Sequence, residues 1–169
     1  MVYVSEVYST VPAKFSTDLQ KQVYQTLQVL EMDFQRVETD EVITMADCQQ
    51  INQRLDMEMV KTLFLCNRQK TKFYLFVTAG DKPFKAKEFS QALEIPRVSF
   101  AAAEQMAAML GTKIGAATIF SVLLNEARQV QLVLDQEVCD HEWYGCSDGT
   151  TTGYLKLKTS EVLQKFLPS

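Results

Sequence analysis

The sequence predicts a single α/β domain in which peripheral helices surround a mixed, mostly antiparallel sheet. Three observations support this fold class. Patterns typical of amphipathic helices are interspersed with short strand patterns, and two strong strand patterns flank one short polar turn. Helices and strands do not alternate regularly enough for a doubly wound parallel sheet. The 169 residues, of which 47 % are hydrophobic, suit one domain over 1–169 with a substantial core.

The first third of the chain carries two helical patterns with a short strand between them. Residues 16–32 are expected to form a helix that begins at a serine cap, because aliphatic residues recur there at helical spacing. A short strand is expected at 34–37. Thr44 and Asp47 resemble a capping box, which predicts a second helix toward Leu55.

The middle of the chain carries the two strongest strand patterns. Residues 62–66 are almost continuously apolar, and residues 73–78 are rich in aromatic and β-branched side chains. The polar stretch 67–72 between them predicts an antiparallel hairpin. A Gly-Asp-Lys-Pro break at 80–83 then precedes an expected helix at 86–93.

The second half of the chain alternates between short strands and helices. An alanine-rich helix at 101–110 is expected to end at Gly111, because glycine favours the left-handed conformation at helix C-termini. A last helix begins at Thr159 or Ser160. Strands are expected at residues 98–100, 117–123, 130–134, 143–146 and 154–158. A polar turn joins the second and third of these strands.

The charge of the chain is unevenly distributed. The formal net charge is −4, which excludes a generally basic nucleic-acid-binding coat. Residues 61–90 nevertheless hold seven positive and two negative side chains, a local charge of +5. The other 139 residues hold 10 positive and 19 negative side chains, a charge of −9. The net charge therefore does not exclude a local basic face.

Several classes of site and location are not supported by the sequence. The four cysteines form no CxxC pair and there is one histidine, so we expect reduced, buried thiols in a cytoplasmic protein, with no metal site and no cofactor. GxGxxG, P-loop, GxSxG and HExxH motifs do not occur. His141 lies in a polar stretch and is expected to be a solvated loop residue. No apolar run reaches the roughly 18–20 residues that cross a bilayer, so no membrane partner is expected.

Three places remain where residues could carry chemistry, each with a simpler structural alternative. Lys61 opens a buried strand, where its ammonium group either reaches a ligand at the end of the sheet or extends into solvent at the strand edge. The segment 111–117 has two glycines, which either allow close approach to a ligand or simply stop a helix. The segment 145–153 has no bulky aliphatic residue. It is either a loop that binds a small polar group or a long hairpin turn.

Taken in order, these segments resemble the YbaK/prolyl-tRNA-synthetase-associated editing domain family, most closely its freestanding prolyl-tRNA editing branch. The resemblance covers about residues 18–167. It rests on the order of short motifs at 61–65, 73–77, 97–101, 110–115 and 145–146, the last of which is followed by a hydroxyl-rich loop.

The resemblance implies a compact α/β fold with a barrel-like sheet and a pocket at its mouth. It also implies hydrolysis of the ester between a wrong amino acid and the 3′-terminal adenosine of a tRNA, commonly alanyl-tRNA for proline. Lys61 matches the family's functional lysine and is the expected catalytic residue. Substrate contacts are expected from Thr62, Gly111, Ile114, Gly115, Ala116, Ser147, Asp148, Thr150, Thr151, Thr152 and Gly153.

The sequence departs from the family pattern at the pocket loops. Thr62 replaces the asparagine that often follows the lysine, and Ile114 stands where the Gly-x-x-Pro-Gly loop has proline. Ser147 and Asp148 replace a His-Pro pair, and Thr151 replaces an asparagine. The carboxylate and hydroxyl groups that remain indicate a different polar site.

We therefore expect an aminoacyl-tRNA deacylase that positions a water and stabilises the oxyanion, with Lys61 holding the terminal nucleotide or the ester. The expected partner is the tRNA acceptor end, bound by Arg68, Lys70 and Lys72 on the basic hairpin, and no DNA. The sequence gives no oligomeric state. Two alternatives remain open: a non-catalytic sensor of aminoacyl-tRNA, amino acid or protein on the same fold, and a hydrolase of another small ester or nucleotide conjugate.

Overall fold

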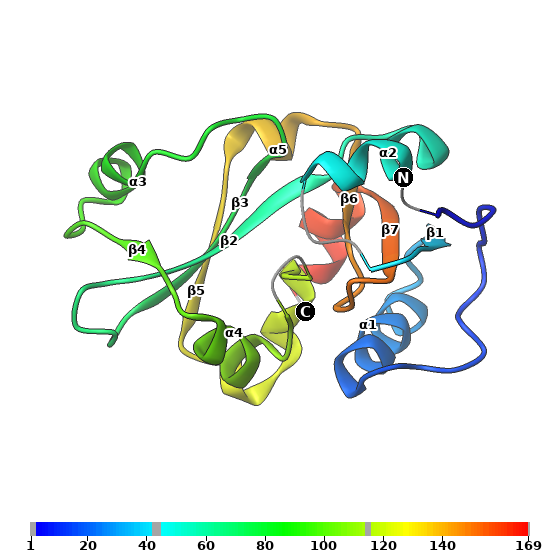
Figure 1. The fold of residues 1–169 in the computed structure, drawn as a ribbon, viewed down its shortest axis with the longest axis horizontal. Coiled ribbons are helices and arrows are strands. Elements are labelled where there is room, and N and C mark those ends of the chain that lie inside the picture. Colours follow the sequence, from blue (N-terminus) through cyan, green and yellow to red (C-terminus); the bar gives the residue numbers. More distant parts are fainter. Residues whose placement is uncertain (1–2, 42–44, 114–115, 169) are drawn as a thin grey trace.

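The computed structural model describes residues 3–41, 45–113 and 116–168, and its strands form two sheets that lie side by side (Figure 1). The antiparallel three-stranded sheet has the order β1 (Phe34–Glu38), β7 (Gly153–Lys158) and β6 (Trp143–Ser147). The four-stranded sheet has the order β4 (Ser99–Phe100), β2 (Val60–Cys66), β3 (Phe73–Ala79) and β5 (Val130–Leu134).

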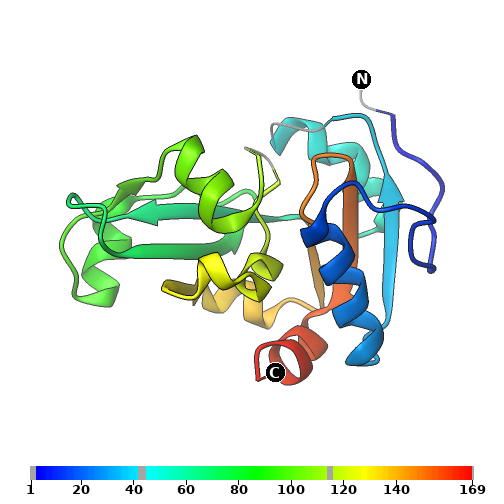
Figure 2. The same cartoon turned by 90° about the horizontal axis from the view of Figure 1, so that it is seen from below.

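Helices surround both sheets (Figure 2). The α-helices are α1 (Asp18–Val29), α2 (Cys48–Leu55), α3 (Ala86–Leu93), α4 (Ala103–Leu110), α5 (Gln136–Asp140) and α6 (Thr159–Glu161). A π-helix at Val162–Phe166 continues the last of them, and short 3₁₀ helices occupy Met45–Asp47, Ile119–Leu123 and Asn125–Ala127. No helix in the described ranges has the length and apolar character that crossing a bilayer requires.

Among the described residues, one backbone bridge joins the two sheets, and side chains of both sheets, such as Val60 and Leu155, share a core cluster. Met59, directly before β2, forms an isolated parallel bridge with Gly145 of β6. Glycine suits this close approach, because a Cβ on Gly145 would lie 3.0 Å from the Glu58 carbonyl oxygen and 2.3 Å from Sδ of the flexible Met57 side chain. One bridge does not close the strands into a barrel, so the barrel-like sheet implied by the resemblance is not confirmed. The structure is a single α/β domain with mixed sheets.

The core of the three-stranded sheet lies against α1. Leu19, Val23 and Leu27 of the helix are buried together with Leu155 and Leu157 of β7. The three α1 residues belong to the aliphatic pattern that predicts the helix. Leu155 and Leu157 form one face of the strand predicted at 154–158. The opposite face of this sheet is partly covered by α2.

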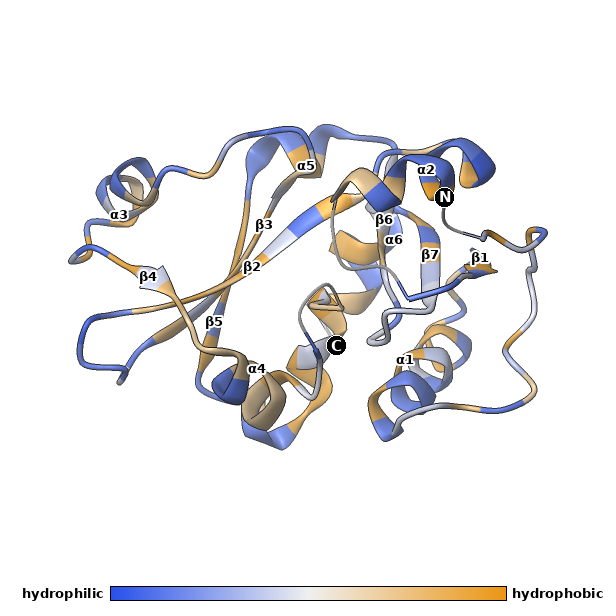
Figure 3. Cartoon of the chain, in the orientation of Figure 1, coloured by the Kyte–Doolittle hydropathy of each residue, from blue (hydrophilic) through white to orange (hydrophobic). Residues whose placement is uncertain are grey.

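The four-stranded sheet is covered on both faces. Phe64 and Leu75 pack against Leu110 of α4, whereas the neighbouring residues Leu65 and Tyr74 pack on the side of α3. Because successive side chains of a strand point to opposite faces, α3 and α4 lie on opposite sides of this sheet. Both strands therefore have nearly continuous apolar sequences, and the hairpin turn between them is hydrophilic (Figure 3).

Most of the predicted elements are confirmed, and the errors have a physical reason. The helix at 86–93 and the left-handed Gly111 (φ +67°) are as expected. The strand expected at 117–123 is wrong: Ile119–Leu123 is a 3₁₀ helix. Its first three residues are completely buried, and a short apolar run of this kind does not distinguish a strand from a buried helical turn. Consequently β5 is not part of a hairpin and pairs in parallel with β3.

The N-terminal segment runs along the outer edge of β1. Val4 bridges Thr39 and Tyr8 bridges Arg36, both antiparallel. The buried Arg36 side chain stacks over the Tyr8 ring and donates hydrogen bonds to the Thr10 carbonyl oxygen (2.5 Å) and the Glu38 carboxylate (2.9 Å). This contact fixes the segment that leads into α1.

Candidate functional site

A cavity of about 440 Å³ lies between the N-terminus of α1, the end of α4 and the loop that joins β6 to β7. Both glycine-containing segments singled out in the sequence contribute to it. The predicted substrate-binding residues that line it are Gly111, Ala116, Thr150, Thr151 and Thr152. Ser16, Thr17, Glu41, Thr112 and Lys113 line it as well. Among the described residues, the wall is therefore rich in hydroxyl groups and has one carboxylate, that of Glu41, and one ammonium group, that of Lys113.

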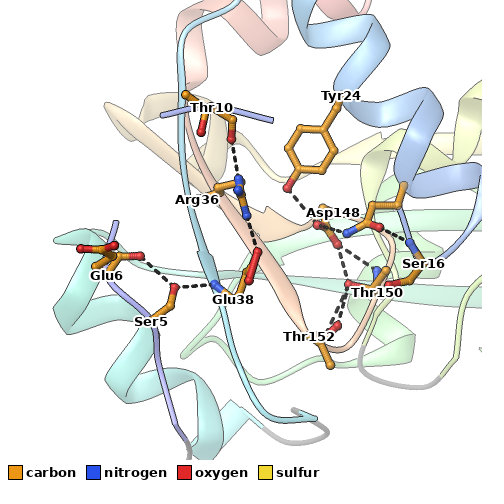
Figure 4. A network of polar contacts seen from close by, with 11 residues as sticks. Ser5, Glu6, Thr10, Ser16, Tyr24, Arg36, Glu38, Asp148, Thr150 and Thr152 are labelled. Atoms are coloured by element: carbon orange, nitrogen blue, oxygen red, sulfur yellow. Dashed lines mark hydrogen bonds and ion pairs between the residues drawn. The ribbon is translucent and has the colours of Figure 1, made fainter. Parts of the chain in front are cut away.

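Asp148 lies at the centre of the hydrogen bonds of the β6–β7 loop (Figure 4). It is not among the residues that line this cavity. Asp148 is buried, with 1 % of its surface exposed. One carboxylate oxygen accepts hydrogen bonds from the Gln20 amide group and the Tyr24 hydroxyl, each at 2.9 Å. The other accepts from the hydroxyl (2.7 Å) and the backbone amide (3.2 Å) of Thr150. Four donors thus compensate the cost of burying this carboxylate.

The rest of the loop is a compact turn built around the same carboxylate. The Ser147 hydroxyl donates to the Thr150 carbonyl oxygen (2.7 Å) and accepts from the Gly149 amide (3.0 Å). Gly149 has φ +97°, a conformation that favours glycine. A Cβ on Gly153 would lie 2.2 Å from a carboxylate oxygen of Asp148, so this position also requires glycine. Ser147, Asp148 and Gly153 do not line the cavity, but Ser147 and Asp148 hold Thr150, which does.

Helix α1 is attached to this loop through two polar side chains. The Gln20 side chain accepts from the Ser16 amide (2.6 Å) while it donates to Asp148. Burial, followed by the nearby Asp148 charge, raises the pKa of Tyr24 far above its usual range, so its hydroxyl stays a donor. We did not predict Gln20 or Tyr24 from the sequence. The available signal was two polar groups beside the aliphatic pattern of an amphipathic helix.

Lys61 lies away from the cavity. It is opposite Thr78 in the β2–β3 register and shares the sheet face covered by α3, whereas Thr62 points to the α4 face. The Lys61 ammonium group donates to the carbonyl oxygen of Lys82. Neither Lys61 nor Thr62 lines the cavity. The structure therefore does not bring Lys61 together with the two loops.

Lys82 is itself part of a polar cluster on that face. Its ammonium group lies 2.7 Å from Asp135, which also accepts from the Thr78 hydroxyl at 2.8 Å. Burial acts to raise the pKa of Asp135, but the hydrogen bonds from Lys82, Thr78 and the Glu137 amide outweigh it and lower this pKa. The pKa of Lys82 is raised by its hydrogen bond with Asp135.

The three basic residues predicted to bind tRNA lie at the turn of the β2–β3 hairpin. Arg68, Lys70 and Lys72 are exposed, and the Asn67 side chain accepts from the Thr71 and Lys72 amides to fix the turn. The seven residues of β2 separate this turn from the junction of the sheets, a length of roughly 20–25 Å. The remaining predicted residues, Ile114 and Gly115, are outside the described part of the chain.

Cysteine and histidine side chains are absent from the described wall of the cavity. Cys146 is buried in the core, and burial raises the pKa of its thiol despite a hydrogen bond with Thr118. His141 is exposed at the end of α5, as predicted. The described wall of the cavity therefore offers hydroxyl groups, a carboxylate and an ammonium group for binding, and no thiol or imidazole.

Comparison with known proteins identifies relatives across most of the chain. Residues 39–165 match the model of the family described as the aminoacyl-tRNA editing domain. The prolyl-tRNA editing protein ProX of Acetoanaerobium sticklandii is 26 % identical over 150 residues, which are 88 % of this chain and 92 % of the relative. The prolyl-tRNA synthetase associated domain-containing protein 1 of Danio rerio is 25 % identical over 149 residues, 87 % of this chain and 80 % of the relative.

Solved structures share the fold. A hypothetical protein gives a TM-score of 0.69 at 18 % identity, with 85 % of this chain and 93 % of that chain covered. A candidate trans-editing enzyme for prolyl-tRNA synthetase gives 0.65 at 15 % identity, with 88 % and 92 % covered. These similarities establish the arrangement of the elements, and the sequence comparisons establish the family.

Proposed function

We propose, on the premise that this chain belongs to the aminoacyl-tRNA editing domain family, that it acts in trans as a deacylase of mischarged tRNA. The observation that carries the proposal is the cavity where the segment after α4 and the β6–β7 loop meet. Its volume of about 440 Å³ falls in the range of small-molecule sites, which suits a terminal adenosine with its aminoacyl group. The partner in this proposal is the acceptor end of the tRNA.

The mechanism needs a positioned water and no protein nucleophile. An aminoacyl ester is intrinsically labile, so holding a water against its carbonyl carbon and stabilising the oxyanion supply much of the acceleration. The water oxygen bonds to the carbonyl carbon, and the bond from that carbon to the ribose oxygen breaks. The vicinal ribose hydroxyl accepts the water proton and passes its own to the leaving oxygen. The backbone amides of Thr112 and Lys113 and the hydroxyls of Thr151 and Thr152 are the proposed contacts.

A panel of mischarged tRNAs tests this function directly. We expect the protein to accelerate deacylation of at least one of them well above spontaneous hydrolysis, because hydroxyl-bearing residues of two segments line the cavity. Release of labelled amino acid over time is the measurement. Binding without any turnover across the panel would overturn the deacylase proposal and favour the sensor.

For Lys61 we propose a role in holding the nucleotide part of the tRNA, since its ammonium group lies on the α3 face and not in the cavity. In the same panel, Lys61→Ala is expected to raise KM about tenfold with a smaller change in kcat, which is the signature of lost uniform binding. Lys21→Ala, at an exposed lysine of α1, is the matched control and should leave both constants unchanged. Identical constants for Lys61→Ala and the unaltered protein would remove Lys61 from the mechanism.

The basic hairpin turn is the proposed contact with the acceptor stem. Changing Arg68, Lys70 and Lys72 together to Glu is expected to weaken tRNA binding at least tenfold and to flatten its salt dependence, because phosphate contacts release counterions. Affinity measured at several salt concentrations checks this. The control variant changes three exposed cations elsewhere, Lys21, Arg128 and Lys158, to Glu. The two variants therefore have the same net charge. Equal affinity of the two variants at low salt would contradict a specific role for the hairpin.

A further inference from the structure

A second cavity, of about 450 Å³, adjoins the candidate site on the side of β1 and the N-terminal segment. Ser16 and Thr152 line both cavities, so the two share part of one wall. Two cations, Arg36 and Lys14, line the second cavity. Both precede residue 39, where the match to the family model begins. The cationic groups of this cavity therefore come from a part of the chain outside the shared family pattern.

Arg36 is a buried cation with one nitrogen unpaired. It lies opposite Leu155 in the β1–β7 register, which places its side chain on the sheet face covered by α1. The residue is 5 % exposed, and its guanidinium group uses Nε to bind Thr10 and Nη1 to bind Glu38 (Figure 4). Within the described ranges, Nη2 has no hydrogen-bond partner. Because buried polar groups are nearly always paired, this nitrogen at a cavity wall indicates an acceptor that enters the cavity.

The hydrogen-bonding groups still available in this wall are mainly donors on the two cations. Asp148 and Glu38 also line the cavity, but Asp148 already accepts four hydrogen bonds and Glu38 is paired with Arg36. Lys14 is exposed, and its ammonium group has no ion-pair or hydrogen-bond partner among the residues that the structure describes. Free donors on a guanidinium and an ammonium group bind the oxygens of phosphates and carboxylates. The cavity is therefore suited to an oxyanion.

We propose that Arg36 and Lys14 bind the phosphodiester that joins the last two nucleotides of the tRNA, while the terminal adenosine occupies the neighbouring cavity. The inference rests on the proposed deacylase function and adds a phosphate subsite to it. This phosphodiester is bonded to the 5′ oxygen of the same adenosine, so the two groups can occupy adjoining cavities. A phosphate held by a buried guanidinium group fixes the ribose, and with it the ester, against the proposed contacts.

The test uses two ligands that differ only in the charge of one linkage. They are the diribonucleotide cytidylyl-(3′→5′)-adenosine and its neutral methylphosphonate analogue, and calorimetric titration measures the Kd of each. We expect the unaltered protein to bind the charged linkage roughly 10- to 100-fold more tightly, the range that a hydrogen bond between charged groups produces. This comparison needs no substitution and so does not depend on how a variant folds. Equal affinity for the two ligands, or no binding of either, would overturn the inference.

Substitutions of the two cations assign the preference to this cavity. Arg36→Lys keeps a charge but loses Nη2, and it should reduce the ratio of the two Kd values to about threefold or less. Lys14→Ala should reduce the ratio roughly threefold, as expected for an exposed charge. Lys21→Ala, at an exposed lysine of α1, is the matched control and should leave the ratio unchanged.

The neutral analogue separates phosphate binding from the structural role of Arg36, which also attaches the N-terminal segment. Its affinity should be the same for Arg36→Lys and for the unaltered protein. An equal loss of affinity for both ligands would assign Arg36 a structural role alone and overturn the inference.

The remaining outcomes separate the inference from the function on which it rests. Free alanine and alaninamide test a carboxylate as the source of the oxyanion: binding of alanine alone, lost in Arg36→Lys, with equal affinity for the two linkages would overturn the phosphate site. Turnover of a mischarged tRNA without a preference for the charged linkage would overturn the inference and leave the deacylase function intact. A preference for the charged linkage without turnover of any charged tRNA would support the phosphate site and overturn the deacylase function.

Discussion

Replacing Asp148 by Ala is expected to lower the free energy of unfolding by about 3–5 kcal/mol. The change removes the acceptor of four hydrogen bonds, from Gln20, from Tyr24 and, twice, from Thr150. A buried donor that loses its partner costs about 1–3 kcal/mol, and these donors are too enclosed for water to replace the carboxylate fully. Urea unfolding followed by circular dichroism measures the loss.

Two milder substitutions show that the loss comes from the hydrogen bonds. Tyr24→Phe removes one donor and leaves the carboxylate with three, so about 1–2 kcal/mol is expected. Asp148→Asn should lie between the two, because its NH₂ group faces groups that themselves donate. If Asp148→Ala were no less stable than Tyr24→Phe, the carboxylate would not organise the loop.

Gly153→Ala is expected to destabilise the protein by about 2–4 kcal/mol, although it adds only one methyl group. The new Cβ would lie 2.2 Å from one carboxylate oxygen of Asp148 and 2.9 Å from the other. The carboxylate must therefore shift, and its bonds to Gln20 and Tyr24 must stretch or break. Deacylation should fall with stability, because the same loop forms the wall of the cavity.

The adjacent residue provides the control for Gly153→Ala. Thr152 is exposed, and its hydroxyl makes only a 3.4 Å contact with Thr150. Thr152→Ala should change the free energy of unfolding by no more than about 0.5 kcal/mol. A similar small effect of Gly153→Ala would show that the Asp148 side chain can move aside at little cost. Thermal and urea unfolding of both variants make the comparison.

The sequence predicts the two loops of the cavity but not the third wall. Glycine and hydroxyl-rich composition identifies the segments at 111–117 and 145–153, and the structure brings residues of both to one cavity. Ser16 and Thr17 complete that cavity from α1, more than a hundred residues away from the β6–β7 loop. Local patterns contain no information about such long-range contacts. The helix itself is predictable, but its neighbours are not.

The position of Lys61 shows a different limit. The sequence predicts β2 correctly, and strand alternation then puts Lys61 and Thr62 on opposite faces. Which face borders the cavity depends on where α3 and α4 pack, and this is a property of the tertiary structure. The face on which a strand residue lies is therefore easier to predict than what packs or binds against that face. Likewise, the parallel pairing of β3 with β5 depends on the 3₁₀ helix that replaces an expected strand.

The dependence of Asp148 on α1 has a consequence for the modularity of this domain. The shared family pattern begins at residue 39, after α1 and β1. A protein cut at that boundary would lose Gln20 and Tyr24, and with them two of the four donors to the buried carboxylate. It would also lose β1, the neighbour of β7 in the three-stranded sheet. The smallest portion that can be transplanted into another protein as a working unit therefore starts upstream of the segment by which the family is identified.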